Sequence, residues 1–566
     1  MYKRFENSIV CCMLIASLLV YSCGSKSDVV APPPSVDPKV PTLNNVTVDG
    51  VNLNNARYNI SLKPQIKLSF SQPLAASSLN AVSLVTATGS MVSVNKALSN
   101  NDSAIILQPV NNLSFLTRFN IIVNQDVQSV SGGTMTGGFT GSFVTKMDSS
   151  RKFPKISDEA LFDTVQRRTL KYFWDFAHPV SGLIREGTKH DSKIVTTGGS
   201  GFGIMALLVA AERGFKTKAE VLHRLQTMIA FLKNTAQHFY GVYPHWLDGS
   251  TGEVIPFSSN DNGADLVETA FLVQGLLCAR QYFDGMTAEE VQLRDDINTI
   301  VNRVQWNWFQ KENDNVLYWH WSPTVSWAMN LKIQGWNECL LTYVLAAGSE
   351  NYSIAKSVYD NGWAQNGGIR NGTIYYGYTL PLGPNLGGPL FFAHYSFLGL
   401  KPYELSDAYA DYWTQNRHHT LINYNYCKAN PKDYYGYSDS VWGLTASNIR
   451  GGYAASSPSN DLGYIAPTAA ISSMPYTPEE SLAALHFYYY VLGDKLFKEY
   501  GFVDAFTLDV MKNDGPWFDD AFLAIDQGPI IVMIENYRSG LLWNLFMSAP
   551  EVKNGLSKLG FNAPGL

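Results

Sequence analysis

The segment Val267–Cys278, with the sequence VETAFLVQGLLC, decides the fold class because apolar residues occupy every face of a helix drawn through it. Two further stretches, Cys339–Ala347 and Ile530–Met547, have the same character. A helix that is apolar all round is buried on every side. The three stretches therefore predict an inner layer of helices within a large helical domain.

Other segments after residue 155 predict amphipathic helices, each with one apolar stripe. The stripes are Leu222, Leu225, Ile229 and Leu232, and then Ile297, Ile300, Val304 and Trp308. Three pairs have the spacing of a capping box, which marks a helix start: Thr217 with Glu220, Thr287 with Glu290, and Thr477 with Glu480. Amphipathic helices around buried ones favour an (α/α)6 barrel over residues 155–566, with an irregular helical bundle as the alternative.

Residues 42–147 have a different composition, with no Trp and no His. Short alternating runs such as Ile66–Phe70 and Phe119–Val123 are separated by clusters of turn residues. This pattern predicts an all-β sandwich of about seven strands. The segment resembles bacterial Ig-like domains, and we expect it to serve as a spacer, with carbohydrate binding as the alternative.

The first residues have the features of an export signal. Lys3 and Arg4 precede the apolar run Ile9–Val20, and Val20–Gly24 resembles a bacterial lipobox. We expect residues 1–22 to be a lipoprotein signal peptide, Cys23 to be lipidated, and residues 23–41 to form a Pro-rich tether. The expected location is the cell envelope, in the periplasm or at the outer membrane or cell surface, with the membrane bound through the lipid anchor.

The composition excludes several functions. The net charge of −6 makes nucleic acid a poor partner, whereas the aromatic content of 13% suits stacking on sugar rings. Cys278, Cys339 and Cys427 lie far apart without metal-ligand spacing, so we expect three buried thiols, no metal and no other cofactor. The run Gly198–Gly203 has no strand before it and no Lys after it, so it predicts a tight helix start close to the site rather than a phosphate loop.

Three acidic residues carry the strongest chemical signal. Asp261, Asp265 and Glu268 are spaced i, i+4 and i+7, which predicts a shared helix face. That face continues into Leu272 and Gly275, so it is not a solvated surface. We expect these carboxylates to line a functional site rather than to decorate a first turn.

Two more carboxylates occur in apolar surroundings. Glu338 is the only charge between Lys332 and Glu350, and loss of hydration raises a carboxyl pKa in the way a general acid requires. Asp526 precedes an apolar stretch that begins with Pro529, where a capping role competes with catalysis. In the same stretch Glu535 and Arg538 are spaced for a structural ion pair.

Aromatic residues gather in the stretches that precede these carboxylates. As a set they predict sugar contacts more than core packing. The predicted substrate-binding residues of this kind are Tyr243, Trp246, His320, Trp321 and Trp336.

The stretch from Ser157 onward resembles the bacterial glycoamylase-like domain, and most closely glycoside hydrolase family 144. The matching blocks are Tyr172–Phe176, Thr197–Gly203, Asp261 to Thr269, Gly335–Glu338 and Ile525–Pro529. The resemblance implies an (α/α)6 barrel that hydrolyses β-1,2-glucan with inversion and without a metal. Most members of the family are endo-acting, and some relatives release sophorose from a chain end.

Carried over by motif, the resemblance implies that Glu338 is the acid and that Asp526 is the first candidate for the base. Asp265 or Glu268 is the fallback base, and Asp261 lines a sugar subsite together with them. An inverting pair needs carboxyls roughly 6.5–9.5 Å apart, which residues on different inner helices can supply.

Other functions remain open at this stage. One is an exo-acting glucan hydrolase, either sophorose-releasing or glucoamylase-like. A polysaccharide lyase is disfavoured because the carboxylates would repel uronates. A non-catalytic lipoprotein that captures glycan is the third, and it would not need a buried Glu338. We expect a monomer.

Overall fold

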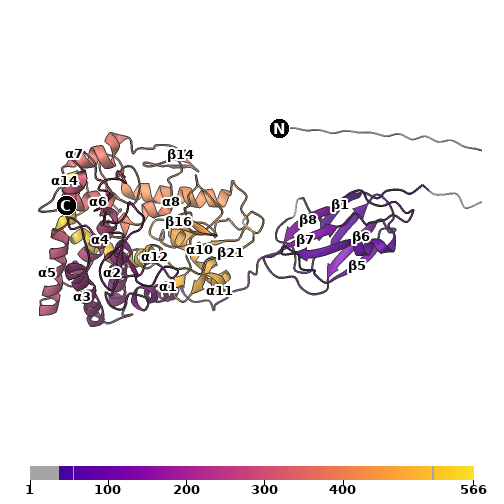
Figure 1. Cartoon of the computed structure of the whole chain (residues 1–566), viewed down its shortest axis with the longest axis horizontal. Helices are drawn as coiled ribbons and strands as arrows, with labels where there is room; N and C mark the ends of the chain where they lie inside the picture. Colours follow the sequence, from indigo (N-terminus) through magenta and orange to yellow (C-terminus); the bar gives the residue numbers. More distant parts are fainter. Residues whose placement is uncertain (1–36, 55–56, 513–514) are drawn as a thin grey trace, which may run out of the picture.

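The computed structural model of the chain describes residues 37–54, 57–512 and 515–566. The predicted signal peptide, Cys23 and most of the Pro-rich tether lie outside these residues. A strand-rich region comes first and a larger helical region follows, and Figure 1 shows the two lying end to end. No helix among the described residues has the length and hydropathy needed to cross a bilayer.

The first region is built from two antiparallel sheets. One has the strand order β2-β1-β3-β6-β5 and the other β4-β7-β8. The strands are β1 (Leu43–Val48), β2 (Val51–Asn52), β3 (Ile66–Phe70), β4 (Val82–Thr86), β5 (Val94–Ser99), β6 (Ala104–Pro109), β7 (Arg118–Val123) and β8 (Phe139–Val144).

The alternating pattern of the sequence explains these strands. In β3, Ile66, Leu68 and Phe70 are buried while Lys67 and Ser69 are partly exposed, and β7 repeats the alternation. The inward-facing residues of both sheets form one apolar cluster. The strands predicted from Ile66–Phe70 and Phe119–Val123 are therefore confirmed.

The second region is mainly helical. Its helices are α1 (Asp158–Trp174), α2 (Thr197–Glu212), α3 (Lys218–Asn234), α4 (Leu266–Tyr282), α5 (Ala288–Asn302), α6 (Leu340–Gly348), α7 (Lys356–Val358), α8 (Tyr412–Ala429), α9 (Pro467–Ile471), α10 (Pro478–His486), α11 (Gly493–Leu496), α12 (Ala524–Arg538), α13 (Leu541–Ser548) and α14 (Pro550–Leu559).

Short strands occur in the loops between these helices. They are β9 (Ile194–Thr196), β10 (Trp246–Asp248), β11 (Val254–Ile255), β12 (Ala264–Asp265), β13 (His320–Trp321), β14 (Ile374–Tyr375), β15 (Tyr378–Thr379), β16 (Ala446–Ile449), β17 (Gly452–Ala455), β18 (Phe497–Lys498), β19 (Gly501–Phe502), β20 (Phe506–Thr507) and β21 (Trp517–Phe518).

The helices form an inner and an outer layer, as their sequences predict. Nearly every residue of α2, α4, α6 and α12 is buried, whereas α1, α3 and α5 each bury one face. In the inner layer α2 packs against both α4 and α12, and α6 packs against α14. The apolar stretch Ile530–Met547 is two helices rather than one, because the chain turns at Gly540 in a left-handed conformation.

Glycines permit the close contact between α2 and α4. The predicted helix start at Gly198–Gly203 lies inside α2, whose first residue is Thr197. The expectation that no strand precedes this run is wrong, because β9 ends at Thr196 and leads directly into α2. A Cβ atom added at Gly201 would lie 2.1 Å from the carbonyl oxygen of Phe271, and one added at Gly275 would lie 2.2 Å from the carbonyl oxygen of Gly201. Only glycine fits between these two backbones.

Two of the three predicted helix starts are capped by their Thr. Thr217 forms the full capping box with Glu220, and Thr287 accepts a hydrogen bond from the backbone of Glu290. Thr477 is different. Its hydroxyl interacts with the carbonyl of Ser473 and the hydroxyl of Ser481, so it does not cap α10.

The two regions contact each other directly. The ring of Tyr58 stacks on that of Tyr435 with centroids 4.6 Å apart, and the Tyr435 hydroxyl donates to the side chain of Asn59. Leu116 and Val144 of the first region are buried in the same apolar cluster as the helical core.

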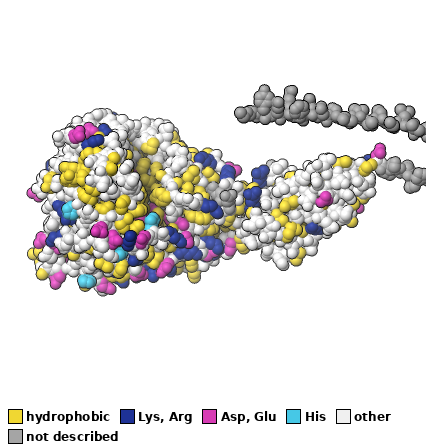
Figure 2. Space-filling model, in the orientation of Figure 1, with side chains coloured by type: hydrophobic (Ala, Val, Ile, Leu, Met, Phe, Trp, Pro, Cys, Tyr) yellow, Lys and Arg dark blue, Asp and Glu magenta, His cyan; other side chains and the backbone are white. Residues whose placement is uncertain are grey.

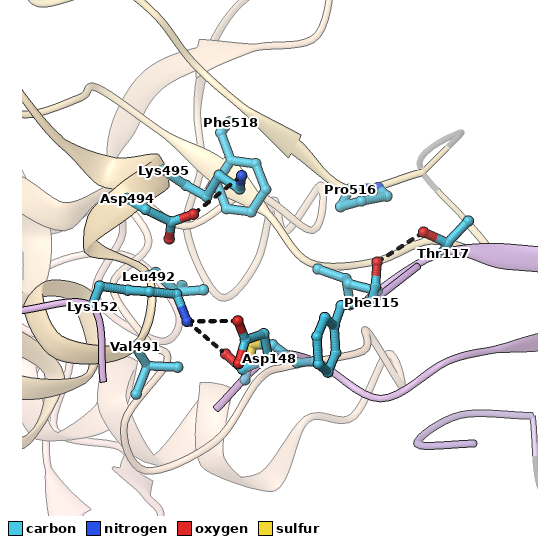
Figure 3. Close-up of a pocket in the computed structure, with 12 residues that line it drawn as sticks. Phe115, Thr117, Asp148, Lys152, Val491, Leu492, Asp494, Lys495, Pro516 and Phe518 are labelled. Carbon is cyan, nitrogen blue, oxygen red and sulfur yellow. Dashed lines mark hydrogen bonds and ion pairs between the residues drawn. The ribbon is translucent and has the colours of Figure 1, made fainter. Parts of the chain in front are cut away.

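Beside this contact, a cavity of about 320 Å³ lies between the regions (Figure 3). Phe115 and Thr117 approach it from the strands, and Pro516 and Phe518 from the helical side. Its lysines are paired, Lys152 with Asp148 and Lys495 with Asp494.

Candidate active site

The candidate site is built around the N-terminus of α4. Asp265 precedes this helix as its N-cap residue, and its Oδ1 accepts hydrogen bonds from the backbone of Val267 and Glu268. Asp265 also belongs to β12, which pairs with β13 so that Asp265 lies opposite His320. The prediction that Asp261, Asp265 and Glu268 share one helix face is therefore wrong, because α4 begins only at Leu266.

The same three carboxylates still converge through β12 and the loop before it. Oδ2 of Asp265 lies 3.4 Å from Nδ1 of His245 and 3.3 Å from Nε2 of His320. The same His320 nitrogen lies 3.5 Å from Oδ2 of Asp261. Two histidines and two aspartates thus form one buried network of charges at the start of α4.

The network fixes the ionisation of its members. Burial raises the pKa of Asp265, but His320 and His245 outweigh it and hold that pKa well below its usual range. Burial lowers the pKa of His245, but the charges of Glu268 and Asp265 outweigh burial and raise it to about 10. Burial and the charge of Asp265 raise the pKa of Asp261 to about 6. Asp265 is thus a permanently ionised partner of the two histidines.

These residues also have the spacing of metal ligands. One ligand atom each from His245, Asp261 and Asp265 lies within 4.8 Å of the others. The same atoms also form the ion pairs of Asp265 with His245 and of Asp265 and Asp261 with His320.

Glu268 lies in the first turn of α4 and is 8% exposed. Its Oε2 accepts a hydrogen bond of 2.7 Å from the backbone of Gly198. A Cβ atom at that glycine would lie 2.5 Å from the same oxygen. Burial raises the pKa of Glu268 to about 7, with the charges of Asp265 and Glu186 adding to it and that of His245 opposing it.

Glu338 lies in the turn before α6 and keeps partial exposure. Its backbone carbonyl accepts a hydrogen bond from the Ser396 hydroxyl, which anchors the turn. Burial of the carboxyl raises its pKa to about 7, and repulsion from Glu268 and Asp265 adds to the shift. Glu338 can therefore hold a proton near neutral pH, which is what a general acid requires.

Asp526 is in the first turn of α12 and is 1% exposed. The helix begins at Ala524, so Pro529 lies inside it rather than at its start. Asp504, in the loop after β19, acts on the Asp526 carboxyl through its charge, and neither carboxyl oxygen of Asp526 has a hydrogen-bond partner among the described residues. Burial, followed by the charge of Asp504, raises the pKa of Asp526 well above its usual range.

A cavity of about 490 Å³, within the size range of small-ligand sites, is lined by Glu268 and His245 but not by Glu338, Asp265 or Asp526. Glu268, His245 and Trp246 line one part of it, and Asn448 and Tyr453 of the β16–β17 hairpin line another. The charges of both Asp526 and Glu338 act on Tyr395 and Tyr453, two tyrosines that line the cavity. On the face of the helical region that Figure 2 shows, hydrophobic side chains gather around a hollow.

The predicted aromatic residues lie in different surroundings. Trp246 lines the cavity and contacts Phe257. Trp321 is partly exposed and packs against Tyr240 and Trp308.

The remaining two aromatic candidates, Tyr243 and Trp336, are packed inside the protein. Trp336 is 4% exposed, lies against Phe397 and donates to Nδ1 of His419 at 3.4 Å. Tyr243 is fully buried and donates to the carbonyl of Leu232. Packing alone accounts for both residues, and neither lines the cavity.

Sequence reasoning missed Asp504, Glu186 and His245. Asp504 has a visible signal, because it is the only charge between Glu499 and Asp509 in an apolar run. His245 stands next to Trp246, but its role depends on the pairing of β10 with β9, which brings Trp246 opposite Thr196. Glu186 lies in a loop and has no such signal.

Two family models match parts of the chain. The Glycoamylase family model, described as "Putative glucoamylase", matches residues 330–550, and that of the bacterial Ig-like domain matches residues 43–145. An endo-β-1,2-glucanase structure from Chitinophaga pinensis, in complex with sophorotriose and glucose, is 50% identical with a TM-score of 0.70. The match covers all of that chain and 73% of this one.

This chain belongs to the glycoamylase-like family, glycoside hydrolase family 144. A β-1,2-glucanase structure from Parabacteroides distasonis, another relative, is 36% identical with a TM-score of 0.69. That match covers 93% of this chain and 74% of the other. The exo β-1,2-glucooligosaccharide sophorohydrolase (non-reducing end) of the same organism is 44% identical over 425 residues. This alignment covers 71% of this chain and 58% of the length of that relative.

Proposed function

We propose that the protein is a glycoside hydrolase that cleaves β-1,2-glucan by an inverting acid/base mechanism, within helices arranged as an (α/α)6 barrel. The observation that carries the proposal is that Glu338 and Glu268 both have a pKa raised to about 7, the charge of Glu268 acts on Glu338, and Glu268 lines the cavity. Membership of glycoside hydrolase family 144 and the glucan hydrolases among its relatives support the substrate.

In this mechanism Glu338 is the acid. Its pKa of about 7 leaves a large protonated fraction at neutral pH, and that proton goes to the glycosidic oxygen as the bond to the anomeric carbon breaks. Glu268 has the same raised pKa, and a backbone hydrogen bond stabilises the charged form of each of the two carboxyls. The assignment of Glu338 as the proton donor therefore follows the family motif Gly335–Glu338 rather than the pKa.

Asp526 is the proposed base. It lies in the first turn of α12, and its charge and that of Glu338 both act on Tyr395 and Tyr453, two residues that line the cavity. Asp265 is a poor substitute because its charge is already neutralised by two histidines. Glu268 is the fallback base, and Asp261, His320, Trp246 and Trp321 are proposed to bind sugar.

We propose endo action, in accord with the endo-β-1,2-glucanase relative that is 50% identical. Exo release of sophorose is the second candidate, favoured by the 44% identical sophorohydrolase. Incubation of the protein with linear β-1,2-glucan, followed by chromatography of the products over time, decides between them. Endo action gives a ladder of oligosaccharides at once, whereas exo action gives sophorose alone from the first minutes.

The substrate class is tested on a panel that adds soluble starch, laminarin, β-1,4-glucan and a polyuronate. Turnover of β-1,2-glucan alone supports the proposal. Release of glucose from starch would favour glucoamylase-like action instead. Binding of glycan without turnover of any member of the panel would favour a glycan-capture protein.

We also propose a lipid anchor at Cys23 in the cell envelope and a monomeric state. The basic residues, apolar run and Cys23 at the start of the sequence support the anchor. Metabolic labelling with a radioactive fatty acid should mark the wild-type protein and not Cys23→Ser, and light scattering of residues 37–566 should give the mass of one chain.

A further inference from the structure

Glu186 lines the cavity, and the acid/base step gives it no role. Of the residues that line this cavity, Glu186 and Glu268 carry carboxyl groups. Glu268 accepts a hydrogen bond from the backbone of Gly198, whereas no hydrogen bond or ion pair within residues 37–54, 57–512 and 515–566 involves the side chain of Glu186. Both oxygens of this carboxyl are therefore free to accept hydrogen bonds from a ligand.

The backbone of Glu186 is fixed between the starts of two inner helices. Its N–H donates to the carbonyl of Ile194 in β9, the strand that leads into α2. Its carbonyl accepts from the N–H of Ala524, the first residue of α12, and from the hydroxyl of the buried Tyr172 on α1. The backbone polar groups of Glu186 are thus in use within the fold, and its side chain is the part left to contact a ligand.

The neighbouring Arg185 shows which way the Glu186 side chain points. Arg185 pairs with Val195 in an antiparallel bridge, so the chain is extended here and consecutive side chains point to opposite faces. The guanidinium of Arg185 donates to the carbonyls of Phe176 and Ser192, at 3.0 and 2.7 Å, and lies over the ring of Phe176. Arg185 is turned away from the cavity, and the carboxyl of Glu186 faces it.

The groups around this carboxyl suit a neutral ring that carries hydroxyls. The charge of Glu186 acts on His245, Glu268 and Tyr453, which all line the cavity. Phe257 also lines it, and about half of the surface of Phe257 and of Tyr453 is exposed. Aromatic faces can stack on the apolar face of a sugar while carboxylates accept from its hydroxyls. Two carboxyl groups in one cavity repel an anionic ligand.

We propose that Glu186 is a specificity-determining residue, whose two carboxylate oxygens accept hydrogen bonds from the 3-hydroxyl and 4-hydroxyl of one glucose unit in the cavity. The proposal rests on the proposed function, because it takes β-1,2-glucan as the substrate. The two oxygens share one carbon, so they lie close enough together to accept from two adjacent hydroxyls.

The linkage of the glucan decides which hydroxyls are available. Within a chain, a glucose ring has two adjacent pairs of ring positions that can carry hydroxyls, 2,3 and 3,4, and a linkage at carbon 2 leaves only the 3,4 pair. Every internal unit of β-1,2-glucan offers this pair. Internal units of β-1,3- and β-1,4-glucan have one of its two oxygens in the linkage. A carboxylate that needs both hydroxyls therefore favours the β-1,2 chain over these two.

Binding of sophorotriose tests the contact without relying on turnover. The titration is calorimetric and uses proteins that also carry Glu338→Gln, so that hydrolysis does not consume the ligand. Glu186→Gln should bind about 10- to 100-fold more weakly, because one neutral acceptor replaces two charged ones. Asp191→Asn is the matched control, because Asp191 is exposed in the same loop and does not line the cavity. The control should bind as the parent does, and equal binding by Glu186→Gln would overturn the proposal.

The hydroxyl pair is tested with an analogue of sophorotriose that lacks the 3-hydroxyl on every unit. Loss of this hydroxyl should weaken binding at least about tenfold when Glu186 is present, and no more than about twofold in Glu186→Ala. An equal loss in both proteins would overturn the assignment of Glu186 to this hydroxyl. If Glu186→Ala does not fold, Glu186→Asp replaces it, because it withdraws the carboxyl by one methylene group and should also reduce the loss.

Kinetics on linear β-1,2-glucan separate substrate binding from a role in the chemical step. Glu186→Gln should raise KM and leave kcat close to the wild-type value, with an unchanged unfolding temperature because the side chain has no partner to lose among the described residues. A fall in kcat that added azide restores would overturn the binding role, because azide can replace a missing base.

These measurements distinguish failure of the inference from failure of the function. Hydrolysis of β-1,2-glucan with an unchanged KM in Glu186→Gln keeps the function and overturns the inference. Sophorotriose binding that depends on Glu186, in a wild type that does not hydrolyse the glucan, supports the inference and overturns the function. A wild type that neither binds nor hydrolyses these glucans overturns both.

Discussion

Replacement of Glu338 by Gln removes the proposed proton donor while it keeps the size and hydrogen-bonding shape of the side chain. The loss of a general acid lowers the rate by about 100- to 10,000-fold. Because the Gln amide also carries no charge, the variant should bind β-1,2-glucan as well as the wild type does. The expected result is a fall in kcat within this range with a KM close to the wild-type value.

The same substitution should stabilise the protein at alkaline pH. The pKa of Glu338 is raised from 4.5 to about 7, chiefly by burial. Its stabilising contribution is present below the unfolded pKa and is lost as the pH rises through about 7. The full loss is roughly 3 kcal/mol, because a tenfold change in the ionisation constant corresponds to about 1.4 kcal/mol. Gln has no such loss, so the unfolding temperature of the variant should exceed that of the wild type at pH 8.

The assay measures new reducing ends from linear β-1,2-glucan at pH 6 and pH 8, with calorimetric unfolding at the same pH values. Glu350→Gln is the matched control, because Glu350 is exposed just beyond the end of α6. The control should retain wild-type kcat and stability. Full activity of Glu338→Gln would refute the assignment of Glu338 as acid, and destabilisation at every pH would refute the physical reasoning about its burial.

Four further outcomes are expected from the same geometry. The kcat/KM of the wild type should fall as the pH rises through about 7, since Glu338 then loses its proton; a flat profile up to pH 9 would contradict this. Exhaustive EDTA treatment should leave activity unchanged, because the proposed acid/base step uses only carboxyl groups of the chain, and loss that zinc restores would show a metal site at His245, Asp261 and Asp265. Gly201→Ala should lower the unfolding temperature, because the added Cβ would overlap the carbonyl oxygen of Phe271, and overpacking of this kind costs about 1–3 kcal/mol or more. The control is Gly214→Ala, whose added Cβ would meet no other atom, so it should act only through its local backbone conformation. Tyr435→Ala should make the junction between the two regions more sensitive to limited proteolysis and leave hydrolysis of short oligosaccharides unchanged; equal protection would mean that the stack with Tyr58 is dispensable.

Much of the fold could be predicted from the sequence because burial constrains which residues a helix can contain. All-round apolar stretches became the inner helices α4 and α6, and single-stripe segments became the outer helices α3 and α5. Cys278, Cys339 and Cys427 are free and buried, as predicted. These properties depend on local sequence, where the period of a helix or strand is directly visible.

The errors arose where tertiary contacts override local spacing. Glu535 and Arg538 have the spacing of an ion pair, yet Glu535 binds Arg213 of the loop after α2 at 2.7 Å, and Arg538 binds Asp163 of α1. An inner helix is surrounded by other helices, so its charged residues find partners there. The shared helix face of the three carboxylates fails for the same reason, because the pairing of β12 with β13 keeps the helix from beginning before Leu266.

In the candidate site, the raised pKa of Glu338 could be predicted from the sequence, whereas the position of Asp504 could not. The isolation of Glu338 within an apolar stretch correctly indicated a raised pKa. The proximity of Asp504 to Asp526 could not be predicted from the sequence. Asp504 lies 22 positions earlier and approaches Asp526 only through the packing of α12 against the loop after β19. Contacts of this kind depend on the path of the chain rather than on any pattern within it.

The measurement that tests the central claim most directly is proton NMR of the wild type during hydrolysis of linear β-1,2-gluco-oligosaccharides. The first product resonance should be that of the α-anomer, followed by slow equilibration with the β-anomer, because water attacks the anomeric carbon from the face opposite the departing oxygen. Initial appearance of the β-anomer would contradict the inverting mechanism, and the absence of any hydrolysis would contradict the proposed activity itself.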